Sequence, residues 1–62
     1  MKGFIGVITT SLHNVLIAVD SIESVDGEKY SDYVDITMRS GNTYTVIDNY
    51  IGIAKRIRDA QE

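Results

Sequence analysis

The chain of 62 residues contains no cysteine, no proline and no tryptophan, and its only histidine is His13. Without cysteine there is no disulfide framework, no thiolate nucleophile and no thiolate zinc site. A single histidine does not make a metal site either, because structural and catalytic sites need several ligands. We therefore expect no cofactor and no bound metal.

Long hydrophobic runs are also absent. The longest uncharged apolar stretches, Phe4–Ile8 and Val15–Val19, are far too short to span a bilayer. The chain does not open with a basic segment, a long apolar stretch and a small-residue cleavage site. We therefore expect a cytoplasmic protein with no membrane partner.

Positive charge is scarce, since 6 Lys and Arg stand against 9 Asp and Glu, which gives a net charge of −3. A general nucleic-acid binder needs a broad basic face. Half of the basic residues instead lie near the C-terminus, at Lys55, Arg56 and Arg58. This distribution predicts no extended nucleic acid as a partner.

The length predicts a single domain over residues 1–62. A chain of this size buries only about 60% of the surface that its unfolded form exposes. Small domains usually gain stability from disulfides, metals or oligomerisation. Because the first is excluded and the second has no ligand set, we expect a homo-oligomer.

Most of the chain has the composition of strands, because nine Ile and six Val make β-branched aliphatic residues frequent. Val15–Val19 is nearly continuous in apolar residues, which predicts a central strand buried on both faces. Tyr33–Arg39 instead alternates, with Val34, Ile36 and Met38 on one face, as in a half-buried antiparallel strand. We predict strands at about 4–10, 14–19, 21–25, 33–39 and 43–48.

Turn residues separate these segments. Thr10–Asn14 is a polar connection of hairpin length, and Asp26–Lys29 is the clearest loop, prolonged by Tyr30–Asp32. Ser40-Gly41-Asn42 predicts a hairpin turn, because Gly and Asn tolerate the positive φ that two-residue loops require. Gly3 and Gly6 mark places where a strand bulges or where a neighbour approaches closely.

The last segment has the period of a helix, at about residues 49–60. Tyr50, Ile53, Ala54 and Ile57 form one apolar stripe at i, i+3, i+4 and i+7. Asp48 or Asn49 can cap its start, and the three cations near its end suit the helix dipole.

These elements predict an α+β fold: a small twisted antiparallel sheet or open barrel of four to five strands, with one C-terminal helix packed on it. Exposed edges of so short a sheet invite pairing between chains. The predicted core consists of Ile5, Val7, Val15, Ile17, Val19, Ile22, Val34, Ile36, Met38, Val46, Ile53 and Ile57.

Catalytic constellations are not evident. Ser11 and His13 are close together, but they lie in a short turn without an orienting acid, so a polar hairpin connection is favoured. The acidic stretch around Asp32 and Asp35 lacks the pattern of a calcium loop, and no glycine-rich loop joins a strand to a helix. We expect no enzyme.

The aromatic residues indicate a binding site more directly. Tyr30 and Tyr33 can stack on a base, with Arg39 holding a negative charge nearby. The alternative is that these tyrosines pack at a subunit interface while Tyr44 and Tyr50 fill the core. For Lys55, Arg56 and Arg58, capture of an anionic ligand stands against a solvated helix end.

Several segments carry a family resemblance. They are Val7-Ile8-Thr9-Thr10, Val15-Leu16-Ile17, Ile22-Glu23-Ser24-Val25, Val34-Asp35-Ile36-Thr37-Met38, Gly41 and Tyr44-Thr45-Val46. In this arrangement the chain resembles the small FlbD-like flagellar accessory proteins, which have a strand-rich body with a glycine hairpin and a short final helix. Their Val-x-Glu-Ser-like segment before the helix is Val46-Ile47-Asp48-Asn49 here. The resemblance implies a protein–protein adaptor in bacterial motility or regulation.

The chain is also similar in size, and in its expected assembly, to small phage proteins that sequester a nucleotide-derived immune signal of the host. This likeness is an analogy between small proteins and not a shared motif. Two functions are therefore expected. The first is a non-catalytic, phage- or mobile-element-borne oligomer that sequesters an anionic small molecule at subunit junctions through the tyrosines, Arg39 and the helix cations. The second is the adaptor, with a host protein as partner.

Overall fold

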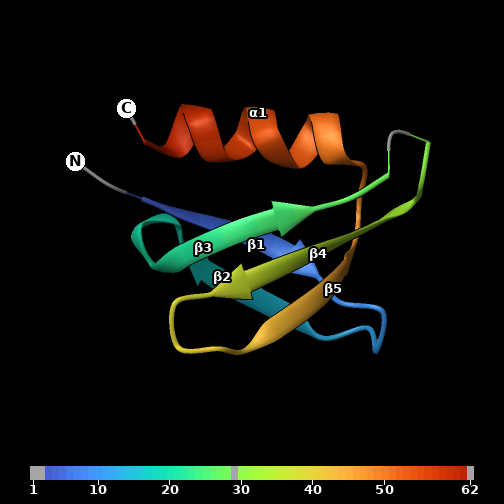
Figure 1. The fold of residues 1–62 in the computed structure, drawn as a ribbon, viewed down its shortest axis with the longest axis horizontal. Helices are drawn as coiled ribbons and strands as arrows, with labels where there is room; N and C mark the ends of the chain where they lie inside the picture. Colours follow the sequence, from blue (N-terminus) through green and yellow to red (C-terminus); the bar gives the residue numbers. More distant parts are fainter. Residues whose placement is uncertain (1–2, 29, 62) are drawn as a thin grey trace.

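The computed structural model describes residues 3–28 and 30–61, so Lys29 of the expected loop lies outside the described residues. Five antiparallel strands precede a C-terminal helix (Figure 1), which confirms the predicted α+β class. Each of the five strands and the helix begins and ends within two residues of its predicted bounds, and the 3-10 turn over Val19–Ser21 was not predicted. The elements are β1 (Phe4–Ile8), β2 (Asn14–Ala18), the 3-10 turn η1 (Val19–Ser21), β3 (Ile22–Asp26), β4 (Tyr33–Met38), β5 (Thr43–Ile47) and α1 (Tyr50–Ala60).

The strands form two sheets and not one continuous sheet. β1 pairs with β2, and β4 lies between β3 and β5. The two sheets meet where Thr9, just beyond β1, bridges Val46 of β5, and the Thr10 amide donates to the Thr45 carbonyl at 2.9 Å. The helix contacts β1 of one sheet and β3 and β4 of the other. The two sheets do not close into a barrel, and α1 runs along one side of the strands (Figure 1).

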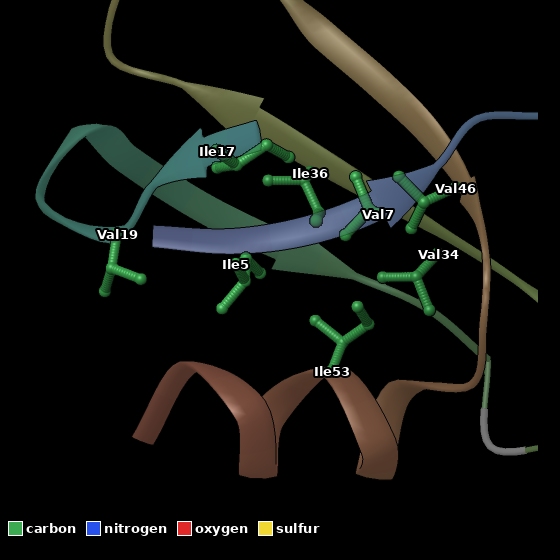
Figure 2. Packing of buried hydrophobic residues seen from close by; sticks show 8 residues of the cluster. All are labelled: Ile5, Val7, Ile17, Val19, Val34, Ile36, Val46 and Ile53. Carbon is green, nitrogen blue, oxygen red and sulfur yellow. The ribbon is translucent and has the colours of Figure 1, made fainter. Parts of the chain in front are cut away.

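The core lies between the two sheets and the helix (Figure 2). Its buried apolar side chains, within the described residues, all belong to the predicted core. Of the other predicted core residues, Val15, Ile22, Met38 and Ile57 are partly buried and pack against it. The eight buried apolar side chains among the described residues are Ile5, Val7, Ile17, Val19, Val34, Ile36, Val46 and Ile53.

The helix begins with a side-chain cap. Of the two predicted cap residues, Asp48 and Asn49, Asn49 caps the helix, since its side-chain oxygen accepts a hydrogen bond from the Gly52 amide at 2.6 Å. The predicted stripe is wrong in part, because Tyr50 and Ala54 are exposed. Ala60 instead packs on the core behind Ile53 and Ile57. With 3.6 residues per turn, the observed set Ile53, Ile57 and Ala60 (i, i+4 and i+7) forms one side of a helix just as the predicted set does. The spacing of the apolar residues alone did not decide which of these two sets faces the sheets.

The prediction that Val15–Val19 is a central strand buried on both faces is wrong. β2 is an edge strand of the two-stranded sheet, and Val19 belongs to η1. Ile17 points into the core, but the neighbouring Leu16 keeps 69% of its surface exposed. One face of this apolar strand is therefore uncovered in the single chain.

Candidate binding surface

The predicted tyrosine–arginine site is not assembled within one chain. Tyr33 opens β4 and Arg39 follows its end, so roughly 20 Å of strand separates them at about 3.3 Å per residue. The Arg39 guanidinium donates from Nε to the Asp20 carbonyl at 3.1 Å, which ties it to η1. Tyr30 lies in the β3–β4 connection and is 89% exposed.

Tyr33 borders a polar hollow of about 480 Å³ on the outside of the three-stranded sheet. Its walls include three carboxylates, from Asp26, Glu28 and Asp35. Their charges repel an anion from this hollow, because like charges in proximity are unfavourable. The environment of Tyr33 is therefore opposite in sign to the one that the anion hypothesis needs.

The helix cations differ in their surroundings. Arg56 reaches from α1 to the first sheet, where its guanidinium donates to the Gly6 carbonyl, and it forms an ion pair with Asp48 at 3.4 Å. Lys55 and Arg58 are exposed, and Arg58 lies in the last turn of the helix. Of the six residues proposed for the ligand site, Arg56 is the one that the fold places beside a largely apolar groove.

That groove lies on the outside of the β1–β2 hairpin. In β1, Phe4, Gly6 and Ile8 point away from the core, and Leu16 of β2 pairs with Gly6. Ile47 from β5 extends the same surface. We call the four exposed side chains of Phe4, Ile8, Leu16 and Ile47 the outer apolar face. Between 45% and 69% of the surface of each of these residues is exposed, so a large apolar area meets solvent here.

Gly3 and Gly6 differ in what surrounds them, and the open space on this face lies at Gly6. A methyl group on Gly3 would lie 3.1 Å from the Ala60 carbonyl oxygen, so the helix end accounts for that glycine. A methyl group on Gly6 would meet no atom of the described chain within 4 Å. Gly6 also lacks the positive φ that would require glycine. The prediction of a close approach is thus confirmed within the chain at Gly3, and at Gly6 the space is open.

The hollow over Gly6 continues into a groove of about 490 Å³. Apolar side chains form most of its lining, and Asn14, Asp48 and Arg56 supply polar groups. Sequence reasoning did not find this site, although its signals were present. They were the apolar residues on both faces of Asn14–Ala18 and a glycine inside a strand without a turn to explain it.

The residues that the sequence offered for metal binding or catalysis lie as follows. Within residues 3–28 and 30–61 no group of three or more His, Asp or Glu side chains could hold a metal ion. The Ser11 hydroxyl shares a 2.9 Å hydrogen bond with the buried Thr9 hydroxyl. The Thr9 oxygen also accepts from the His13 amide at 3.2 Å, so these residues shape the β1–β2 loop.

Comparisons with known proteins leave the surface to be interpreted from its own geometry. No family model matches the chain, and neither a curated protein nor a solved structure does. Among the described residues, α1 is too short and too polar to cross a membrane, and no other helix could.

Proposed function

We propose that this chain is a non-catalytic protein–protein adaptor that binds its partner through the outer apolar face. The observation that carries the proposal is Gly6, a glycine inside a strand whose missing side chain leaves open space in the middle of exposed apolar residues. Glycine at such a position allows another molecule to approach the backbone closely. The matching partner feature is an apolar side chain that enters the hollow over Gly6.

The energetics support a macromolecular partner. Burial of apolar surface contributes roughly 25 cal/mol per Å², so covering Phe4, Ile8, Leu16 and Ile47 yields several kcal/mol before the costs of association. Contiguous apolar patches on small soluble proteins commonly mark interaction sites. Among the residues that the structure describes, the groove holds one ion pair, between Arg56 and Asp48, so charge selects the partner weakly.

The test uses variants that alter this face and leave the core intact. Gly6→Val fills the hollow with a side chain whose Cβ meets no atom of the described chain within 4 Å and that favours strands. Leu16→Lys places a charge on the face. Ile51→Lys is the matched control, because Ile51 is exposed to a similar extent, 66%, but lies on the helix outside the groove.

Native mass spectrometry of protein purified from cells that make its partners provides the measurement. A complex with an added protein mass that Ile51→Lys retains and both Gly6→Val and Leu16→Lys lose would support the adaptor. A complex that all three variants retain would place the binding surface elsewhere. Absence of any added mass would contradict the proposal.

Sequestration of a small anionic molecule is the second candidate, favoured by one feature of the same groove. Its volume falls in the range of roughly 300–1,000 Å³ that is typical of ligand pockets, and Arg56 borders it. The partly exposed Arg56–Asp48 pair is of the kind that contributes about 1 kcal/mol or less, so an anion could replace Asp48 at little cost. Here the added mass would be that of a small molecule, and Arg56→Gln would abolish it.

A further inference from the structure

The backbone of β2 presents hydrogen-bonding groups away from β1. The Thr9 amide donates to the His13 carbonyl and the Val19 amide to the Gly3 carbonyl, which defines two hydrogen-bonded pairs of the hairpin. Because such pairs alternate along an antiparallel ladder, Val15 and Ile17 bond to β1. Asn14, Leu16 and Ala18 therefore direct their amides and carbonyls outward. Within residues 3–28 and 30–61 no strand pairs with β2 on that side.

The edge strand β3 of the three-stranded sheet carries features that discourage pairing. Its register against β4 shifts between Ile22 and Ser24, as at a β-bulge. It also bears the exposed carboxylates of Glu23 and Asp26. Bulges and charges are the usual protection of an exposed edge. β2 has no bulge in its register with β1, no proline and no charged side chain.

We propose that β2 pairs with β2 of a second copy of this chain, antiparallel and centred on Leu16. In this register Leu16 faces its own equivalent across a two-fold axis, and Asn14 faces Ala18 of the second copy. Each of these pairs exchanges two N–H···O bonds. The chain has a net charge of −3, but the segment Asn14–Ala18 is neutral, so its self-pairing meets no local charge repulsion.

This pairing goes beyond the proposed function and does not depend on it. It joins two hairpins into a four-stranded sheet in the order β1, β2, β2, β1, and the two outer apolar faces become neighbours on one side. A typical stable interface takes about 800 Å² from each partner, roughly a fifth of the chain's 4371 Å². A five-residue strand supplies less than that, so we expect a weak dimer that depends on concentration.

Hydrogen exchange identifies the edge directly. In the full chain at rising concentration, sedimentation velocity should show a monomer–dimer equilibrium. Over the same range the amides of Asn14, Leu16 and Ala18 should become protected. The amides of Val15 and Ile17, which already bond to β1, serve as internal controls and should be protected throughout. A monomer at all concentrations, or a dimer in which the Leu16 amide still exchanges rapidly, would overturn the proposal.

A pair of matched double variants tests the register. Asn14→Lys with Ala18→Lys places like charges opposite each other in the dimer, whereas Asn14→Glu with Ala18→Lys places opposite charges there. Within one chain the two positions lie about 13 Å apart along the strand, so the monomers are affected similarly. We expect the first variant to dissociate at least about tenfold more readily than the second. Equal dimerisation would contradict this register.

Failure of this inference and failure of the adaptor are distinguishable. Phe4→Ser alters the outer apolar face on β1 and leaves the β2 edge unchanged. If the edge pairs as proposed, Phe4→Ser retains the dimer and its concentration-dependent protection of the Leu16 amide. Loss of that protection in Phe4→Ser would mean that the contact uses the face and not the edge.

Discussion

The β1–β2 and β4–β5 hairpins have the same loop geometry but different residues at its most demanding position. In each loop, an amide donates to the carbonyl four residues later: Thr9 to His13 at 2.9 Å and Met38 to Asn42 at 2.8 Å. Each loop therefore has three residues, and those of the second are Arg39–Gly41, one position before the predicted turn Ser40-Gly41-Asn42. The third residue of each loop adopts a positive φ, 98° at Gly41 and 64° at Leu12. Glycine accepts this conformation freely, and leucine does not.

The outer faces of the two hairpins also differ in the polarity of their side chains. On β4 and β5 two of the three outer cross-strand pairs are polar, with the Thr37 and Thr43 hydroxyls 3.3 Å apart and the Thr45 hydroxyl donating to Asp35 at 2.7 Å. The third pairs Tyr33 with Ile47 beside the groove. On β1 and β2 the corresponding positions are Phe4, Ile8 and Leu16. Away from the Tyr33–Ile47 pair, the second hairpin is thus adapted to solvent on its outer face, and the first is not.

Strain and exposure occur together on the first hairpin. Leu12 has a strained backbone and keeps 75% of its surface exposed, so the single chain gains little burial in return. Backbone strain of this kind persists where the surroundings or a function require it. We infer that the first hairpin is adapted to a contact outside the chain, consistent with the open space over Gly6 and the unpaired edge of β2.

The largest expected effect is on the free energy of unfolding, and it should differ between substitutions at two neighbouring residues of β2. Ile17→Ala removes a fully buried side chain and should cost about 2–5 kcal/mol of unfolding free energy. Leu16→Ala should cost less than about 0.5 kcal/mol in the monomer, because surface substitutions have small effects. Urea denaturation at low protein concentration measures both, and Ile17→Val, at about 0.5–1.5 kcal/mol, keeps the comparison measurable if Ile17→Ala is unfolded. Equal costs at positions 16 and 17 would refute the assignment of faces.

The next effect comes from making the second loop like the first. Gly41→Leu places a side chain at φ 98°, which should destabilise the chain by about 1–2 kcal/mol. Space is not the cause, since a methyl group at Gly41 would meet nothing within 4 Å. Ser40→Leu, in the same exposed loop without a positive φ, is the control and should have little effect. A neutral Gly41→Leu would show that strain at this loop position is negligible.

The converse change should stabilise the first loop. Leu12→Gly relieves the left-handed conformation but gives the unfolded chain more freedom, so the net gain should be about 0.5–1 kcal/mol. Thermal unfolding below the concentration of self-association measures it. Destabilisation of the monomer by Leu12→Gly would mean that the Leu12 side chain contributes more within the chain than its exposure indicates.

Much of the fold could be predicted because strand alternation and helical periodicity depend on local spacing. Val34, Ile36 and Met38 face inward as their alternation indicates. The error at Val15–Val19 has a physical cause: a continuous apolar run indicates two apolar environments, but it does not say whether the second lies in the same chain. The predicted strand over residues 33–39 already places Tyr33 and Arg39 at its two ends, which the hypothesis of a shared binding site did not take into account. The contact of Arg56 with Gly6 spans 50 residues and left no local signal.

The smallest effect tests whether apolar area alone distinguishes the hairpins. Asp35→Val with Thr45→Val replaces the hydrogen-bonded outer pair of the second hairpin by an apolar pair. Stability should change by less than about 1 kcal/mol, because the lost pair and the gained strand propensity are similar in size. If an open edge and the hollow at Gly6 govern association, this variant should sediment like the wild type. New self-association would instead show that any apolar strand face on this fold is sufficient, and the special geometry of β1 and β2 would then be unnecessary.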